Sequence, residues 1–198
     1  MQQVWKQTVM GVIWALVLMM VGSILMSISA MVAVAGALFG SSGAAGGFGF
    51  LTIVCLLAMI GGFVWFFINL SKFITIQQTD ADRSAISNVR TSYIIFIVGA
   101  ILNFIPVVGW IVNLICALVA NILLIIAFNN FSNSQFMNPT GRSGASLLKV
   151  QAIITLICAI LMIIPVVNIL AIIGEIVALV LLFVGWSKVS NGHGEVVL

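Results

Sequence analysis

The chain carries one stretch of sequence twice: residues 83–108 read RSAISNVRTSYIIFIVGAILNFIPVV, and residues 142–167 read RSGASLLKVQAIITLICAILMIIPVV. The second copy follows the first by fifty-nine residues, and the two align without a gap. Each copy leads into a long apolar run that is interrupted by a single proline. The repeat therefore predicts a duplicated structural unit built from two apolar segments.

The composition predicts that lipid is the solvent of this protein. Of its 198 residues, 63% are hydrophobic and only 6% are charged, whereas a soluble domain carries roughly 25% charged residues. A backbone in lipid has to satisfy its own hydrogen bonds, which leaves helices or closed barrels. The apolar runs are much longer than the alternating strands of a barrel, which span about 10 residues. We therefore expect an all-α integral membrane protein.

Breaks in the apolar runs locate the expected helices. The run from residue 93 to residue 128 would form a helix of about 54 Å, which is too long for one crossing. Pro106 and Gly109 divide this run, and Pro165 and Asn168 stand at the same places in the second copy. Proline ends helices, while glycine and asparagine tolerate left-handed backbone geometry. These four residues predict a tight hairpin turn in each copy.

A motif at the end of each hairpin suggests a third, more divergent copy near the N-terminus. Residues 67–72, 128–133 and 183–188 share a phenylalanine, a large apolar residue three positions later, and then a serine. We expect a first span within residues 9–39, a loop at 40–49 and a second span at 50–70. The stretch 9–39 is too long for the apolar core of a signal peptide. The predicted fold is one membrane domain, 1–198, with six transmembrane helices as three parallel two-helix hairpin repeats, at about 8–70, 84–131 and 143–187.

The placement of charge predicts the orientation. With six spans, every base falls on the side of the N-terminus, and the three opposite turns carry none, which follows the positive-inside rule. We therefore expect cytoplasmic N- and C-termini in a bacterial plasma membrane. Trp5, Trp186 and Trp110 stand where interfacial aromatic residues are expected. The bases are Lys6, Lys72, Arg83, Arg90, Arg142, Lys149 and Lys188.

Glu175 is the ionisable residue deepest in an apolar run, about 12 Å from the outer turn. A charge at that depth costs about 2.5–3.5 kcal/mol, so such residues are candidates for function. Asn121 lies at similar depth and is the expected partner, with Asn113 a weaker one. These three residues form a candidate intramembrane polar site. Two interpretations stay open: a site linked to proton or cation movement, and a protonated acid that is hydrogen-bonded between helices.

The remaining polar residues and the cysteines have simpler expected roles. Asp82 or Ser84 is expected to cap a helix that begins near residue 84, and His193 is expected to lie in a solvated tail. The three cysteines lie in apolar runs and are expected to behave as small hydrophobes. Small residues on the first span, from Ser23 to Ala37, suit close helix packing. We expect no metal, cofactor or nucleic acid.

These observations favour a non-enzymatic multi-pass membrane protein of structural or accessory character. The sequence has no hydrolase, metalloprotease or phosphate-binding motif. Its expected partners are the lipid bilayer and a membrane protein or a second copy of the chain. One alternative is a small transporter or channel with a mid-membrane site at Glu175. A second is a membrane-shaping hairpin protein, because residues 91–105 and 150–164 would span only about 22 Å as helix.

Overall fold

The computed structural model describes residues 2–38, 42–103, 105–106, 108–162, 164 and 168–193. These residues form six α-helices: α1 (Gln2–Leu38), α2 (Ser42–Thr75), α3 (Asp80–Leu102), α4 (Gly109–Ser132), α5 (Pro139–Leu161) and α6 (Asn168–Ser190). All six are long and apolar enough to cross a membrane. The predictions of an all-α chain and of six apolar helices long enough to span a membrane are confirmed for the described residues.

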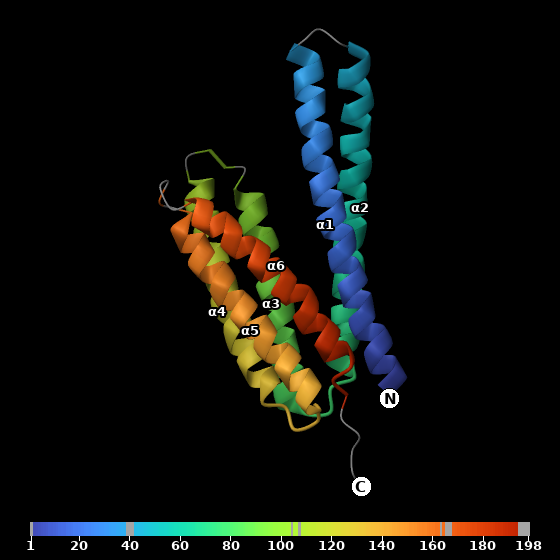
Figure 1. Ribbon diagram of the computed structural model, residues 1–198, viewed down its shortest axis with the longest axis vertical. Helices are drawn as coiled ribbons and strands as arrows, with labels where there is room; N and C mark the ends of the chain where they lie inside the picture. The colour runs from blue at the N-terminus through green and yellow to red at the C-terminus, as the bar shows by residue number, and fades with distance from the viewer. Residues whose placement is uncertain are drawn as a thin grey trace. The chain divides into compact units, whose positions relative to one another are not determined.

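Contacts divide the chain into two compact units. Unit 1 comprises Met1–Met10 and Leu70–Leu198, and unit 2 comprises Gly11–Asn69. In unit 1, α3 packs on α4, α4 on α5, and α5 on α6 (Figure 1). Helices that follow one another in the chain are therefore neighbours in this bundle, as short connections require.

Unit 2 is a hairpin of α1 and α2. The hydroxyls of Ser29 and Thr52 lie 3.0 Å apart and join the two helices. Gly22 lies against the Met59 side chain, and Gly62 lies against that of Met19, so that a methyl group added at either glycine would lie within 3 Å of methionine Cγ. Small residues thus let the two helices approach closely.

The expected loop at residues 40–49 differs from the structure, since α2 begins at Ser42. Continuing the helix lets the backbone of these residues satisfy its own hydrogen bonds. The third helix also begins earlier than expected, at Asp80, because Thr79 is its N-cap and accepts a hydrogen bond from the Asp82 amide. The expectation that Asp82 or Ser84 caps this helix is therefore wrong.

Helices α5 and α6 pack through glycine. A Cβ atom at Gly144 would lie 2.7 Å from the carbonyl oxygen of Gly185, and 2.8 Å from the Val189 nitrogen. Gly185 in turn faces the side chain of Leu148, 2.7 Å from its own added Cβ. Backbone cannot retreat as a flexible side chain can, so only glycine fits at position 144.

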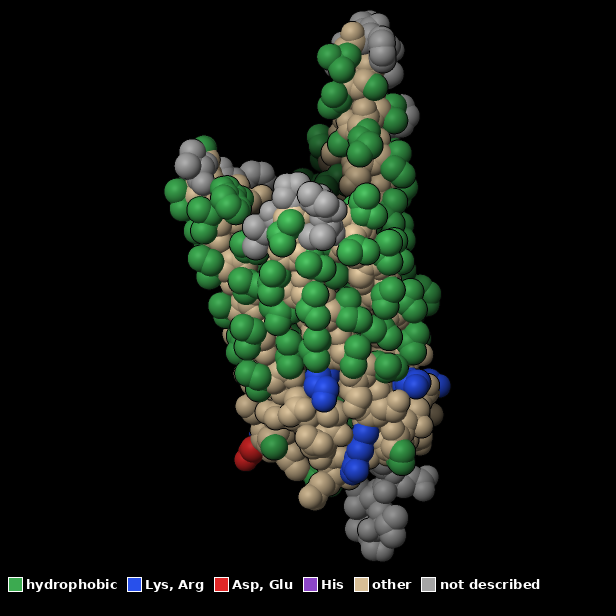
Figure 2. All heavy atoms as spheres, turned by 60° about the vertical axis from the view of Figure 1, so that its left-hand side comes forward, with side chains coloured by type: hydrophobic (Ala, Val, Ile, Leu, Met, Phe, Trp, Pro, Cys, Tyr) green, Lys and Arg blue, Asp and Glu red, His purple; other side chains and the backbone are tan. Residues whose placement is uncertain are grey.

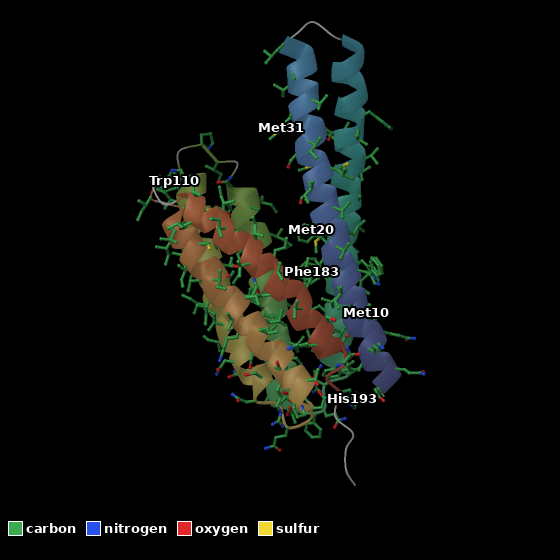
Figure 3. All side chains as sticks on the ribbon, in the orientation of Figure 1. Met10, Met20, Met31, Trp110, Phe183 and His193 are labelled. Carbon is green, nitrogen blue, oxygen red and sulfur yellow. The ribbon has the colours of Figure 1, made fainter. Side chains whose placement is uncertain are left out.

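Hydrophobic and charged side chains occupy different parts of the surface. Figure 2 shows hydrophobic side chains along the length of the helices, with Lys and Arg side chains gathered below them at one end. In unit 1 this end holds the start of α3 and α5 and the end of α4 and α6, and we call it the polar end. Trp110 lies at the opposite end of the bundle from His193 (Figure 3).

Candidate functional site

The surroundings of Glu175 are a hollow of about 460 Å³ between α5 and α6. Glu175 is half-buried, while Ala171 and Ala178 on the same helix are fully buried. Across the hollow, the Gln151 side-chain amide donates a hydrogen bond of 3.1 Å to the Thr155 hydroxyl. Two polar residues of α5, Gln151 and Thr155, thus line the same hollow as Glu175.

Asn121, the expected partner of Glu175, is only 1% exposed on α4. Its side-chain nitrogen donates a 2.9 Å hydrogen bond to the carbonyl of Ala117 on the same helix. Its side-chain oxygen has no hydrogen-bond partner within the part of the chain that the structure describes. The hollow around Glu175 is lined by α5 and α6, and Asn121 is not part of its lining.

Asn113 lies in a third environment, at the crossing of α3 and α4. A Cβ atom at Gly99 would lie 3.0 Å from the Asn113 side-chain oxygen and 2.7 Å from Cβ of Cys116. Asn113 therefore faces α3, whereas Glu175 borders α5. The structure therefore places Glu175, Asn121 and Asn113 in three separate environments.

The hairpin-turn residues are described in part. Pro106 lies in the turn between α3 and α4, where its carbonyl accepts a 2.8 Å hydrogen bond from the Val108 amide. Gly109 is the first residue of α4. Its backbone is therefore helical, whereas the sequence predicts a left-handed backbone there. A side chain there would lie 2.7 Å from the Asn103 carbonyl oxygen, which explains the need for glycine. Asn168 begins α6, while Pro165 lies outside the described residues.

The polar end of unit 1 holds many hydrogen bonds and ring contacts that the sequence does not predict. Within unit 1, α1 contributes only its residues up to Met10, and α2 contributes only its residues from Leu70 onward. Each helix end contacts the next, and together the contacts close a ring that we call the polar ring. Its members are Trp5–Val189 at 2.8 Å, Lys188–Ser143 at 3.3 Å, Lys149–Asn129 at 3.3 Å, Ser134–Asp82 at 2.8 Å, Arg90–Ser71 at 3.5 Å, and the Trp5–Phe73 ring pair at 4.7 Å.

Aromatic side chains fill the centre of this ring. Trp5 packs edge-on against Phe73 and stacks on Phe131, with centroids 4.7 and 6.4 Å apart. Trp186, which is 0% exposed, contacts Phe73 and Phe128 at 6.2 and 6.1 Å. We call these five residues the aromatic core.

Two of the tryptophans expected at the membrane interface are buried inside the protein. Trp5 is 6% exposed and Trp186 is fully buried, while Trp110 is 59% exposed. Burial of an aromatic side chain removes about 150–250 Å² of its surface from solvent. The Trp5 indole N–H donates to the Val189 carbonyl, whereas that of Trp186 has no partner among the described residues.

His193 also departs from its expected place in solvent. It packs edge-on against Trp5 with ring centroids 5.4 Å apart, and it forms an isolated bridge with Met137. Next to it, the Gly192 carbonyl accepts a 2.9 Å hydrogen bond from the Asn138 amide. The end of the described chain is thus held against the loop between α4 and α5.

Asp82 is the buried acid of the polar end, at 4% exposure. The Ser134 hydroxyl donates a 2.8 Å hydrogen bond to its carboxylate, and Arg142 Nε donates to the Ser134 carbonyl at 2.8 Å. Sequence reasoning assigned Asp82 only a capping role. Its neighbours come from a loop more than fifty residues away, so no local pattern identifies them.

The geometry offers no centre for metal chemistry in the described ranges, where no group of three or more His, Cys, Asp or Glu side chains could hold an ion. The described residues instead form a polar end with many contacts between helices, and one acid, Glu175, beside a hollow between α5 and α6. The chain matches no protein-family model, no curated protein and no solved structure.

Proposed function

We propose that this chain is a non-enzymatic multi-pass membrane protein that serves as a structural or accessory subunit of a membrane complex. The observation that carries the proposal is the closed polar ring around a buried aromatic core in unit 1. Each helix end in this ring is held by hydrogen bonds or ring contacts to its neighbours. Such an end favours a fixed scaffold over an element that opens and closes.

The candidate polar residues support the same proposal. Transport requires polar groups that share one path, as at the substrate sites of transporters. Asn121, Asn113 and Glu175 instead contact different elements. Asn121 uses its donor within its own helix, which is how an isolated polar residue reduces its cost in lipid.

We also propose that the helices are three parallel hairpin repeats. Helices α3 and α5 each have 23 residues, and both their starts and their ends differ by the same fifty-nine positions as the sequence repeat. Their N-caps, Thr79 and Asn138, keep this offset and cap in the same way. The helix crossings support it too, since Gly99 meets Cys116 in one hairpin and Cys158 meets Gly174 in the next.

The proposed orientation places the polar end, and both termini, in the cytoplasm of a bacterial plasma membrane. It is supported by the bases of the polar ring, Arg90, Lys149 and Lys188, which belong to three different helices of unit 1. Lys and Arg accumulate on the cytoplasmic side of membrane proteins. Full helices of 23 residues, each about 34 Å long, favour complete spans over membrane-shaping wedges.

The experiment that tests the function is extraction of the tagged chain from native membranes in mild detergent, followed by native mass spectrometry. An accessory subunit is recovered with one partner at fixed stoichiometry, and the partner survives stringent washing. In parallel, purified protein in vesicles is tested for ion and proton flux. A flux that Glu175→Gln abolishes, together with recovery of the chain alone, would replace the accessory function by transport.

A further inference from the structure

The hollow beside Glu175 has the shape of a groove for a helix. On α6 it is bordered by Ile172, Glu175, Leu179 and Leu182, which recur every three or four residues along one face. Ten residues of helix span about 15 Å, so the groove follows α6 for almost three turns. Ala178 forms part of its lining and is only 1% exposed, and a small residue at such a place lets another helix approach closely.

The groove is also bordered by two side chains that can accept hydrogen bonds, Glu175 and Gln151. Glu175 forms no ion pair in the described ranges, where the salt bridge observed joins Arg83 to Asp80 in an exposed turn. Gln151 donates to Thr155 through its side-chain nitrogen, which leaves its amide oxygen able to accept. A carboxyl group, an amide oxygen and the Thr155 hydroxyl therefore border a groove whose remaining lining is apolar and includes Ile172, Leu179 and Leu182.

Acceptor groups within a mostly apolar groove indicate which kind of molecule can bind there. An apolar occupant would leave Glu175 without a partner in lipid, where an unpaired charge costs about 2.5–3.5 kcal/mol. A cation on the occupant would form a charge-assisted hydrogen bond with the carboxylate. Elongation along α6 and a small residue in the lining suit a helix better than a compact molecule.

We propose that the groove between α5 and α6 binds a transmembrane helix of a partner protein that carries a lysine or arginine at mid-membrane depth, paired with Glu175. This inference rests on the proposed function as an accessory subunit, and it names the kind of partner. Ile172, Leu179 and Leu182 contact the apolar flanks of the helix.

The test uses designed transmembrane peptides in lipid vesicles. Three peptides of identical leucine-alanine sequence carry a central lysine, glutamine or leucine, and each bears an acceptor dye for energy transfer from the labelled full-length protein. The lysine peptide is expected to associate about tenfold more tightly than the other two, in line with the strength of polar contacts between membrane helices. The variant Glu175→Gln, which preserves side-chain size, is expected to lose this preference.

A charge exchange keeps the inference falsifiable if the glutamine variant changes folding. The variant Glu175→Lys should prefer a peptide with a central glutamate and reject the lysine peptide. Equal association of all three peptides with the wild type would overturn the proposal. So would Glu175-dependent binding of tetraphenylphosphonium without binding of the lysine peptide, since it would assign the groove to a small lipophilic cation.

The outcome is separable from that of the proposed function. If Glu175→Gln abolishes peptide binding but no native partner is recovered, the groove binds as inferred and the accessory function fails. If a native partner remains bound to Glu175→Gln with unchanged stoichiometry and affinity, the accessory function stands and the assignment of this groove is wrong.

Discussion

Replacing Gly144 by alanine should loosen the packing of α5 on α6. The added methyl group would lie 2.7 Å from the Gly185 carbonyl oxygen and 2.8 Å from the Val189 nitrogen. Both atoms belong to the backbone of α6, so neither can turn aside as a side-chain tip can. The two helices must separate by several tenths of an ångström along the contact.

The expected magnitude follows from two opposing terms. Overpacking of a well-packed contact costs about 1–3 kcal/mol, while exchange of glycine for alanine lowers the entropy of the unfolded chain and returns about 0.4–1 kcal/mol. The net destabilisation is therefore about 0–2.6 kcal/mol, with a central value of about 1.3 kcal/mol. Gly61→Ala on α2 is the matched control, because a methyl group there meets no atom within 4 Å.

The assay is equilibrium unfolding of the purified protein in mixed micelles with increasing dodecyl sulfate, followed by tryptophan fluorescence. Burial of Trp5 and Trp186 supplies the signal of the folded state. Gly144→Ala should shift the midpoint to lower dodecyl sulfate, and Gly61→Ala should leave it unchanged or raise it. If the two variants unfold at the same midpoint, the close approach of α5 and α6 is not as described.

Three further outcomes are expected. Trp5→Phe keeps the ring contacts but loses the indole donor to α6, which should cost about 0.5–1.5 kcal/mol, while Trp5→Ala should cost about 3–5 kcal/mol, both read from the same unfolding curves. A double-mutant cycle of Asp82→Ala and Ser134→Ala should give a coupling of about 1.5–3 kcal/mol, typical of hydrogen bonds to a charged group; a coupling near zero would contradict the contact. A membrane-impermeant maleimide should label Trp110→Cys from outside intact cells and Ser143→Cys only after permeabilisation, and the reverse result would invert the orientation.

Helix boundaries show which features of the structure local sequence can predict. The apolar runs locate all six helices, because the cost of placing charge in lipid applies to each residue separately. The start of α3 at Asp80 could not be chosen in the same way. Threonine, serine and aspartate are all good N-caps, and residues 79–84 contain several of them.

The glycines show a second limit. The sequence identified Gly109 as part of a turn, and the turn is present, yet its role there is close approach to the carbonyl of Asn103 and not a left-handed backbone. Both roles demand glycine. Only the position of the neighbouring helix end distinguishes them.

The sequence alone determined that this is an all-helical chain with six long apolar segments, since the cost of solvation in lipid is a sum over individual residues. The tertiary structure alone decided that Trp5 joins a buried core, through a hydrogen bond to Val189 across 184 positions of the chain. It likewise decided that Glu175 borders Gln151 and Thr155 in a groove. Such neighbours depend on how helices rotate and pack, and helix rotation is set by contacts between residues far apart in the chain.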